Sequence, residues 1–170
     1  MKRKINVFFA LVAVLLLTAN VNVNAQIEKT QASYIYNFTR FIEWPSAGSS
    51  EFVIAIIGKN HPLTAELKAT SANRSVGTLP VKIVEYASAD LIEKCNILFV
   101  PDAKSAQLKK VDEKLHNKTT IVVTEEQGWN PAESTINLQV VDSKLTFSIN
   151  REQINQKSMK VSDKLLALSK

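Results

Sequence analysis

The sequence predicts a three-layer α/β domain, with a mostly parallel central sheet flanked by helices and a C-terminal antiparallel hairpin. Three short apolar runs, at residues 53–57, 97–100 and 121–123, are rich in β-branched residues. They do not alternate with polar residues, which is typical of strands buried on both faces of a parallel sheet. Helix patterns lie between these runs and favour right-handed βαβ units. Near the end of the chain, apolar and polar residues alternate instead, which predicts the hairpin.

Residues 1–25 have the layout of a secretory signal peptide. Basic residues at positions 2–4 precede an apolar run over residues 5–17, and small and polar residues lead up to Ala25. The apolar run is shorter than the roughly 20 residues of a membrane-spanning helix. We therefore expect export to the periplasm and cleavage near Ala25 rather than an uncleaved anchor. Residues 26–170 should then form a single domain that is not inserted in the membrane.

The domain is expected to begin with a helix over residues 28–44. Apolar residues recur at helical spacing along one side, and Pro45 ends the pattern because proline cannot continue a helix. The side that should face the core consists of Gln31, Tyr34, Ile35, Phe38, Phe41 and Ile42.

Further helices and strands follow the first apolar strand. Pro62 suits the first turn of a helix. Residues 79–84 alternate only in part, which places this strand near a sheet edge. A short helix is expected over residues 90–94, and a longer one over residues 108–115, where apolar residues fall at i, i+3 and i+7.

A two-residue turn sets the register of the hairpin over residues 136–149. Six apolar residues then share one face, and the opposite face carries Asn137 across from Ser148. Asn150 and Ser162 are each expected to cap a short helix after the hairpin. The apolar pairs are Ile136 with Ile149, Leu138 with Phe147, and Val140 with Leu145.

The composition argues against an enzyme, a metal site, a cofactor or nucleic-acid binding. The chain has two histidines and one cysteine, none at a metal-ligand spacing, and it lacks nucleophile, phosphate-loop and dinucleotide motifs. Three of its 21 basic residues lie in the leader and all 16 acidic residues lie outside it. The remaining net charge of +2 is interleaved rather than gathered in a basic stripe. Cys95 is expected to be buried and inert rather than reactive.

The strongest case for a ligand site is the edge beyond the carboxyl ends of the parallel strands. Gly58, Asn60, His61 and Asp102 should gather there. The simpler interpretation is that Asn60 and His61 lead into the helix at Pro62. A small-molecule-binding protein that uses this edge is the alternative to a protein-binding function. A hydrolase built on His61 and Asp102 is a third and weaker hypothesis.

The first helix carries aromatic and charged residues that core packing does not require. Off its apolar side, Tyr36, Arg40 and Glu43 recur at i, i+4 and i+7, with Asn37 and Trp44 alongside. One interpretation is a solvated face with an Arg40–Glu43 pair worth a few tenths of a kcal/mol. The other is an interface, because Tyr, Trp and Arg are the residues that most often anchor protein contacts.

Residues 34–45 read Tyr-Ile-Tyr-Asn-Phe-Thr-Arg-Phe-Ile-Glu-Trp-Pro, and this helix resembles the start of the YfiR-like family of exported bacterial regulators. The resemblance continues at residues 52–58, 95–99, 145–150 and 161–166. It implies an α/β sheet flanked by helices in a periplasmic protein that binds the outer domain of an inner-membrane signalling protein. The best-known partner type is a diguanylate cyclase, which the family's namesake represses. A homodimer is also compatible with the sequence.

The same resemblance implies a contact surface on the hairpin and the C-terminal segment. The expected partner-binding residues, including those of the first helix, are Tyr36, Arg40, Glu43, Trp44, Ile136, Ser148, Val161 and Leu165. The chain also departs from its relatives. Ala55 stands where many relatives have a second cysteine, Glu133 and Ser134 stand where they often have Gly-Gly, and Ser148 stands where they often have glutamate. The lost charge at residue 148 could change the choice of partner without harming the fold.

Overall fold

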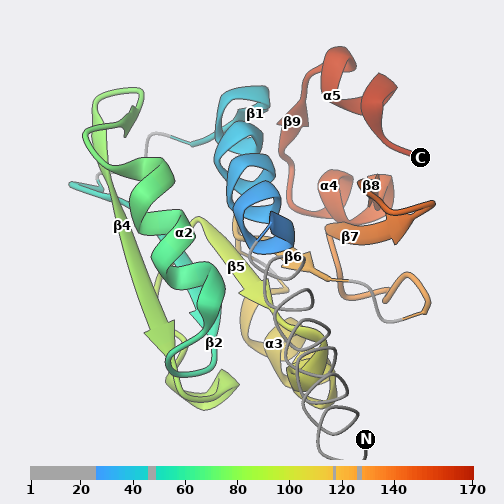
Figure 1. Cartoon of the computed structure of the whole chain (residues 1–170), viewed down its shortest axis with the longest axis horizontal. Helices are drawn as coiled ribbons and strands as arrows, with labels where there is room; N and C mark the ends of the chain where they lie inside the picture. Colours follow the sequence, from blue (N-terminus) through green and yellow to red (C-terminus); the bar gives the residue numbers. More distant parts are fainter. Residues whose placement is uncertain (1–25, 46–48, 117, 126–127) are drawn as a thin grey trace, which may run out of the picture.

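A computed structural model describes residues 26–45, 49–116, 118–125 and 128–170 (Figure 1). The predicted signal peptide lies outside these residues. A helix occupies residues 26–41. The other helical segments are α2 (Pro62–Ser71), η1 (Ala89–Leu91), η2 (Asp102–Gln107), α3 (Leu108–Leu115), α4 (Arg151–Gln156) and α5 (Asp163–Leu168). Among the described residues, no helix combines the length and hydropathy needed to cross a membrane.

The central sheet has seven strands in the order β3-β4-β2-β5-β6-β7-β8. Neighbouring strands from β4 to β7 run parallel, while β3 and β8 pair antiparallel at the two edges. The predicted fold class is therefore confirmed. The strand bounds are β2 (Phe52–Ile57), β3 (Ser75–Val76), β4 (Leu79–Tyr86), β5 (Ile97–Val100), β6 (Ile121–Thr124), β7 (Ile136–Val141) and β8 (Lys144–Ile149).

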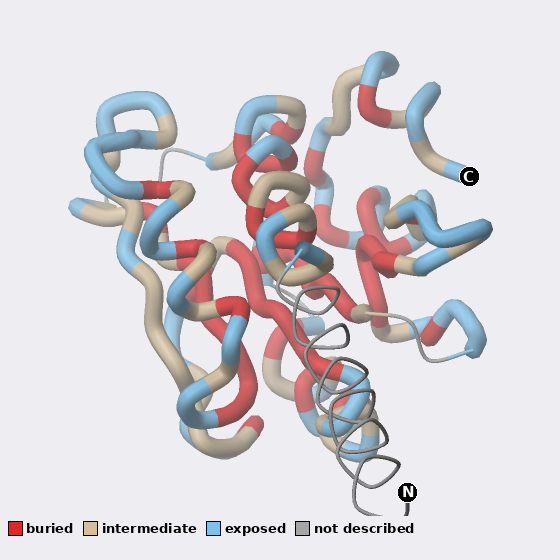
Figure 2. The backbone as a smooth tube through the Cα atoms, viewed as in Figure 1, coloured by how far each residue is buried: buried red, intermediate tan, exposed pale blue. Residues whose placement is uncertain are grey.

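Each face of the sheet packs against its own hydrophobic cluster. Alternate residues of a strand point to opposite faces, so Ile54 of β2 joins the first cluster and Ala55 joins the second. The first cluster includes residues of helix 26–41, α2, the hairpin and α5, and the second includes residues of α3. Figure 2 shows the inner strands as buried along their length. This burial explains why three strands read as unbroken apolar runs.

The first helix ends earlier than predicted. It stops at residue 41, not 44, because the next two residues form β1 (Ile42–Glu43) and pair antiparallel with β9 (Lys160–Val161). Pro45 is thus not the residue that ends the helix. The predicted helix over residues 90–94 is also wrong. Only the three-residue turn η1 forms there.

The hairpin register is confirmed. Ile136 pairs with Ile149, and Asn137 pairs with Ser148. The predicted caps are confirmed as well, because the Asn150 side chain accepts hydrogen bonds from two backbone amides of α4 and Ser162 Oγ accepts one from Leu165 N.

Candidate functional site

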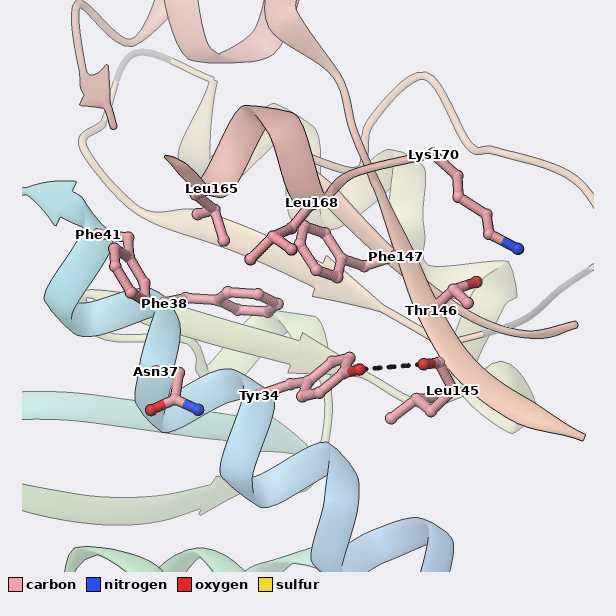
Figure 3. A pocket seen from close by; sticks show the side chains of 10 residues that line it. All are labelled: Tyr34, Asn37, Phe38, Phe41, Leu145, Thr146, Phe147, Leu165, Leu168 and Lys170. Atoms are coloured by element: carbon pink, nitrogen blue, oxygen red, sulfur yellow. Dashed lines mark hydrogen bonds between the residues drawn. The ribbon is translucent and has the colours of Figure 1, made fainter. Parts of the chain in front are cut away.

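An apolar groove of about 200 Å³ lies between helix 26–41, β8 and α5 (Figure 3). The helix and the hairpin contribute aromatic side chains, and α5 contributes two leucines. The lining residues are Tyr34, Asn37, Phe38, Phe41, Leu145, Thr146, Phe147, Leu165, Leu168 and Lys170.

Three aromatic rings hold the floor of the groove in place. The ring centroid of Phe147 lies 5.2 Å from that of Phe38 and 5.8 Å from that of Tyr34, in edge-on arrangements that aromatic pairs prefer. The Tyr34 hydroxyl donates a hydrogen bond of 3.1 Å to the carbonyl oxygen of Leu145, so it also covers part of the β8 edge. These contacts make the groove a preformed surface rather than a gap between mobile side chains.

The rim of the groove is open to solvent at α5. Leu168 is 60% exposed, whereas Leu165 on the same helix is 3% exposed. Phe41 is half-buried, and the ammonium group of Lys164 lies 5.6 Å from its ring centroid. A second lysine, Lys170, also lines the groove. The described rim therefore combines exposed apolar area with positive charge.

Backbone pairing holds α5 against the end of helix 26–41. Ser162 N donates a hydrogen bond of 2.9 Å to the Phe41 carbonyl, just beyond the short β1–β9 pairing. Lys170 N donates one of 2.9 Å to the Phe147 carbonyl on β8. The two ends of the C-terminal segment are thus tied to different walls of the groove, which fixes its width.

Of the four residues predicted on the first helix, Tyr36 is buried, Trp44 is half-buried, and Arg40 and Glu43 are exposed. Tyr36 is 9% exposed, with the guanidinium carbon of Arg74 at 5.1 Å from its ring centroid. Trp44 packs edge-on against Phe52 at 4.8 Å, and its Nε1 donates to the Thr39 carbonyl. Both aromatic residues therefore serve packing.

Arg40 and Glu43 are exposed. Glu43 pairs with Lys160 across β1 and β9, with 3.6 Å between Oε2 and Nζ, rather than with Arg40 as the solvated-face interpretation assumed. Arg40 has no ion pair with a described residue, and it lies three positions after Asn37, a groove residue, on the same helix. Residues at this spacing are surface neighbours, so Arg40 adds a further positive charge beside the groove.

The predicted hairpin and C-terminal residues do not form one surface. Ile136 is 1% exposed, while Val161 pairs with Ile42 in the small sheet. Leu165 lines the groove as a buried residue. Ser148 lies on the polar face of the hairpin, where its hydroxyl donates to Asn130 Oδ1. Of the four, only Leu165 contributes to the groove.

The edge proposed for a small ligand is occupied by the protein's own carboxylate. Glu85 accepts hydrogen bonds of 2.9 Å from Asn60 N and His61 N and a further one from the Thr64 hydroxyl. Burial alone would raise the pKa of Glu85, but these hydrogen bonds hold it below its usual value. The amides at the start of α2, which could otherwise bind an anion, are therefore already satisfied.

The structure does not join His61 to Asp102. His61 Nδ1 accepts a hydrogen bond of 3.2 Å from Leu63 N, so His61 is the N-cap of α2. Asp102 N donates to Glu125 Oε1 at 2.8 Å. No hydrogen bond or ion pair among the described residues links the two side chains, so they do not form an acid–base pair.

Neither the cysteine thiol nor the potential metal ligands form a reactive site among the described residues. Cys95 is 5% exposed, and burial raises the pKa of its thiol to about 12, which keeps the group protonated and unreactive. Across the described ranges, no group of three or more His, Cys, Asp and Glu side chains is placed to hold a metal ion.

Sequence reasoning missed the groove, although it placed several of its residues correctly. Tyr34, Phe38 and Phe41 were expected on the core side of the helix, and Phe147 on the apolar face of the hairpin. Leu168 is an apolar residue near the end of the chain, and only its exposure in the folded protein distinguishes it. The surplus of aromatic residues on the first helix was the one feature of the sequence that could have indicated the groove.

Comparison with known proteins agrees with the resemblance read from the helix motif. The model of the DUF4154 family, described as YfiR/HmsC-like, matches residues 28–170. No curated protein matches the chain. The matched range begins in the first helix and includes the hairpin and α5, which together form the groove. The chain therefore belongs to the YfiR/HmsC-like family.

Proposed function

We propose that this protein is an exported, non-catalytic regulator that binds the periplasmic domain of an inner-membrane signalling protein, of which a diguanylate cyclase is the leading example. Family membership supports a regulatory role rather than a catalytic one. The observation that carries the proposal is the preformed apolar groove with Leu168 exposed at its rim. A clustered apolar surface rimmed by polar and charged groups is typical of a protein-binding site.

The chemistry of the groove indicates what kind of segment it would bind. Aromatic and leucine side chains form its walls, so the partner segment should present apolar side chains, as an amphipathic helix does in a hydrophobic groove. Lys164, Lys170 and Arg40 lie at or near the rim. Acidic residues beside the apolar segment would complement these charges and speed association.

Such a protein regulates its partner by binding one conformation better than another. A regulator changes an equilibrium only by its difference in affinity between the two states. To move a receptor from about 1:99 to 99:1 requires a difference of about 5.5 kcal/mol. Burying Leu168 and Phe41 against one receptor state alone would supply a substantial part of that difference, because a fully buried leucine or phenylalanine contributes about 1.5–3 kcal/mol.

Site-specific photocrosslinking in intact cells tests this proposal. A photoreactive residue would replace Leu168 in one variant and Leu91 in a matched control, because Leu91 is 58% exposed but lies outside the groove. We expect the residue-168 variant to trap an inner-membrane signalling protein and the residue-91 variant not to trap it.

Two outcomes would contradict the proposal. Equal trapping of the same protein from both positions would show that the groove is not the contact surface. Trapping of only a second copy of this chain from residue 168 would indicate self-association through the groove instead of regulation of a receptor. Secreted amounts of both variants must match the wild type for either comparison to count.

A further inference from the structure

A second cavity, of about 250 Å³, lies beside the polar face of the β7–β8 hairpin. Its lining differs in kind from that of the groove. Apart from Pro131, Ile149 and Lys170, it consists of Asn130, Ser134, Thr135, Asn137, Ser148 and Asn150. Among the described residues, Lys170 is the one charged residue that lines it, and no Asp or Glu side chain does.

Asn130 is the centre of a side-chain network over this polar face. Its Oδ1 accepts hydrogen bonds from Asn137 Nδ2 at 2.9 Å, Gln139 Nε2 at 2.8 Å and Ser148 Oγ at 3.0 Å. An amide oxygen has two lone pairs, so three donors exceed its capacity. Asn130 Nδ2 and Gln139 Oε1 make no hydrogen bond to a described residue. The network therefore keeps both donor and acceptor capacity for a further molecule.

An exposed tryptophan adjoins this network. Trp129 is 55% exposed, and it directly precedes Asn130. Its carbonyl oxygen accepts a hydrogen bond of 3.2 Å from Asn137 Nδ2, which fixes the loop to the hairpin. Figure 1 shows this loop next to the β7–β8 hairpin. A single exposed apolar side chain is normal on a protein surface, but this indole directly precedes Asn130, which lines the polar cavity.

We propose that this face binds a neutral saccharide. A sugar ring presents neighbouring hydroxyl groups, each a donor and an acceptor. The side-chain amides of Asn130, which lines the cavity, and of Gln139, which is hydrogen-bonded to Asn130 without lining the cavity, supply both complements. One side of the ring presents C–H groups, which pack against the face of an indole such as that of Trp129. The described lining residues include a single lysine and no Asp or Glu, which favours an uncharged sugar over a cationic or strongly anionic one.

The size of the cavity limits the ligand to a single ring in the site. Pockets for drug-sized molecules measure roughly 300–1,000 Å³, and this one is smaller. One unit of a glycan chain would therefore occupy it while neighbouring units lie over the exposed loop. Contacts of this kind give weak binding, with a dissociation constant on the order of 1 mM.

Titration of the purified protein with cellotriose, maltotriose and triacetylchitotriose tests the proposal. The chain has two tryptophans, and Trp44 is packed against Phe52, so a change in fluorescence should come from Trp129. We expect saturable binding of at least one sugar by fluorescence and calorimetry. Gln139→Ala should weaken it about fivefold, which corresponds to the loss of one hydrogen bond, and Trp129→Ala should abolish it.

Two control variants separate this site from the groove. Leu168→Ala alters only the proposed protein-binding groove, and Leu91→Ala removes an exposed leucine elsewhere, so both should bind the sugar as the wild type does. The proposal is overturned if none of the three sugars binds saturably at up to about 10 mM, ten times the expected dissociation constant. Binding that Trp129→Ala and Gln139→Ala both retain at full strength would overturn it equally.

Discussion

Glu85 shows how one side chain can both organise a loop and close a ligand site. Its carboxylate holds Asn60 and His61 at the start of α2. The sequence correctly predicted that these two residues directly precede α2, because a polar residue before proline is a local signal for the start of a helix. It could not identify Glu85 as their partner, because β4 and β2 lie side by side only in the folded sheet.

The folded-state pKa of Glu85 is lowered, so its ionised form stabilises the fold above the unfolded pKa near 4.5. That contribution is lost as the pH falls through the folded pKa. We expect Glu85→Gln to lower the free energy of unfolding by about 1 kcal/mol at pH 7, since glutamine keeps one acceptor oxygen. Below pH 4 the difference from wild type should shrink.

Urea denaturation at pH 7 and at pH 3 measures the difference in free energy of unfolding between Glu85→Gln and the wild type. Glu93→Gln is a suitable control, because Glu93 is exposed and makes none of the hydrogen bonds that Glu85 makes at the start of α2. A deficit in Glu85→Gln that stays constant between pH 7 and pH 3 would show that packing, not charge, explains the effect.

Cys95 should be inert in the folded protein. Its thiol is buried, with a pKa raised to about 12, and thiols react as thiolates. We expect negligible labelling by Ellman's reagent at pH 8 in native buffer and one equivalent in denaturant. Rapid labelling of the native protein at a rate independent of added urea would contradict the burial of this residue.

At the scale of elements, the local sequence pattern predicted the hairpin correctly. It did not predict where the first helix ends, because that boundary depends on a non-local strand pairing. Alternation fixed the hairpin register because a one-residue slip would move Leu138 and Phe147 to the solvent face. Nothing near Ile42 in the sequence indicates that it pairs with Val161, 119 residues later. The groove depends on the same non-local pairing, and the sequence alone could not show it.

The N-cap of α5 should control the groove wall. Ser162 Oγ accepts a hydrogen bond from Leu165 N, and loss of such a cap costs about 1 kcal/mol. We expect Ser162→Ala to lower the Tm by about 4 °C and to speed hydrogen exchange of the amides in residues 163–168. The photocrosslink from residue 168 should weaken in parallel.

Asn150→Ala provides the matched control for that experiment. Asn150 caps α4 in the same way, but α4 contributes no residue to the groove. A similar loss of stability without a change in the crosslink is expected. If both variants weaken the crosslink equally, general destabilisation explains the result and the α5 cap has no special role.

At the scale of the molecule, one cluster joins the first helix, the sheet and the C-terminal segment. Phe38, Phe99 and Leu165 belong to the same buried group, although they come from separate parts of the chain. The length predicted a single core for a domain of about 145 residues, whereas the sheet separates two buried clusters, one on each face. Which side chains meet at the border of the first cluster, where the groove opens, depends on the order of strands and helices in the folded chain.

Phe147 lies where that cluster meets the groove, so its replacement should affect both stability and binding. It is 7% exposed and contacts the rings of Tyr34 and Phe38. Truncation of a buried phenylalanine to alanine costs about 3–5 kcal/mol. We therefore expect Phe147→Ala to lose about 3 kcal/mol in urea denaturation, and Phe147→Leu to lose less because it refills part of the volume. Phe41→Ala, at the half-buried rim, should cost less than about 1.5 kcal/mol yet reduce partner capture more strongly than Phe147→Leu. The opposite ranking, with the rim variant costing more stability and less binding, would mean that Phe41 belongs to the core and that the groove is not the surface the partner contacts.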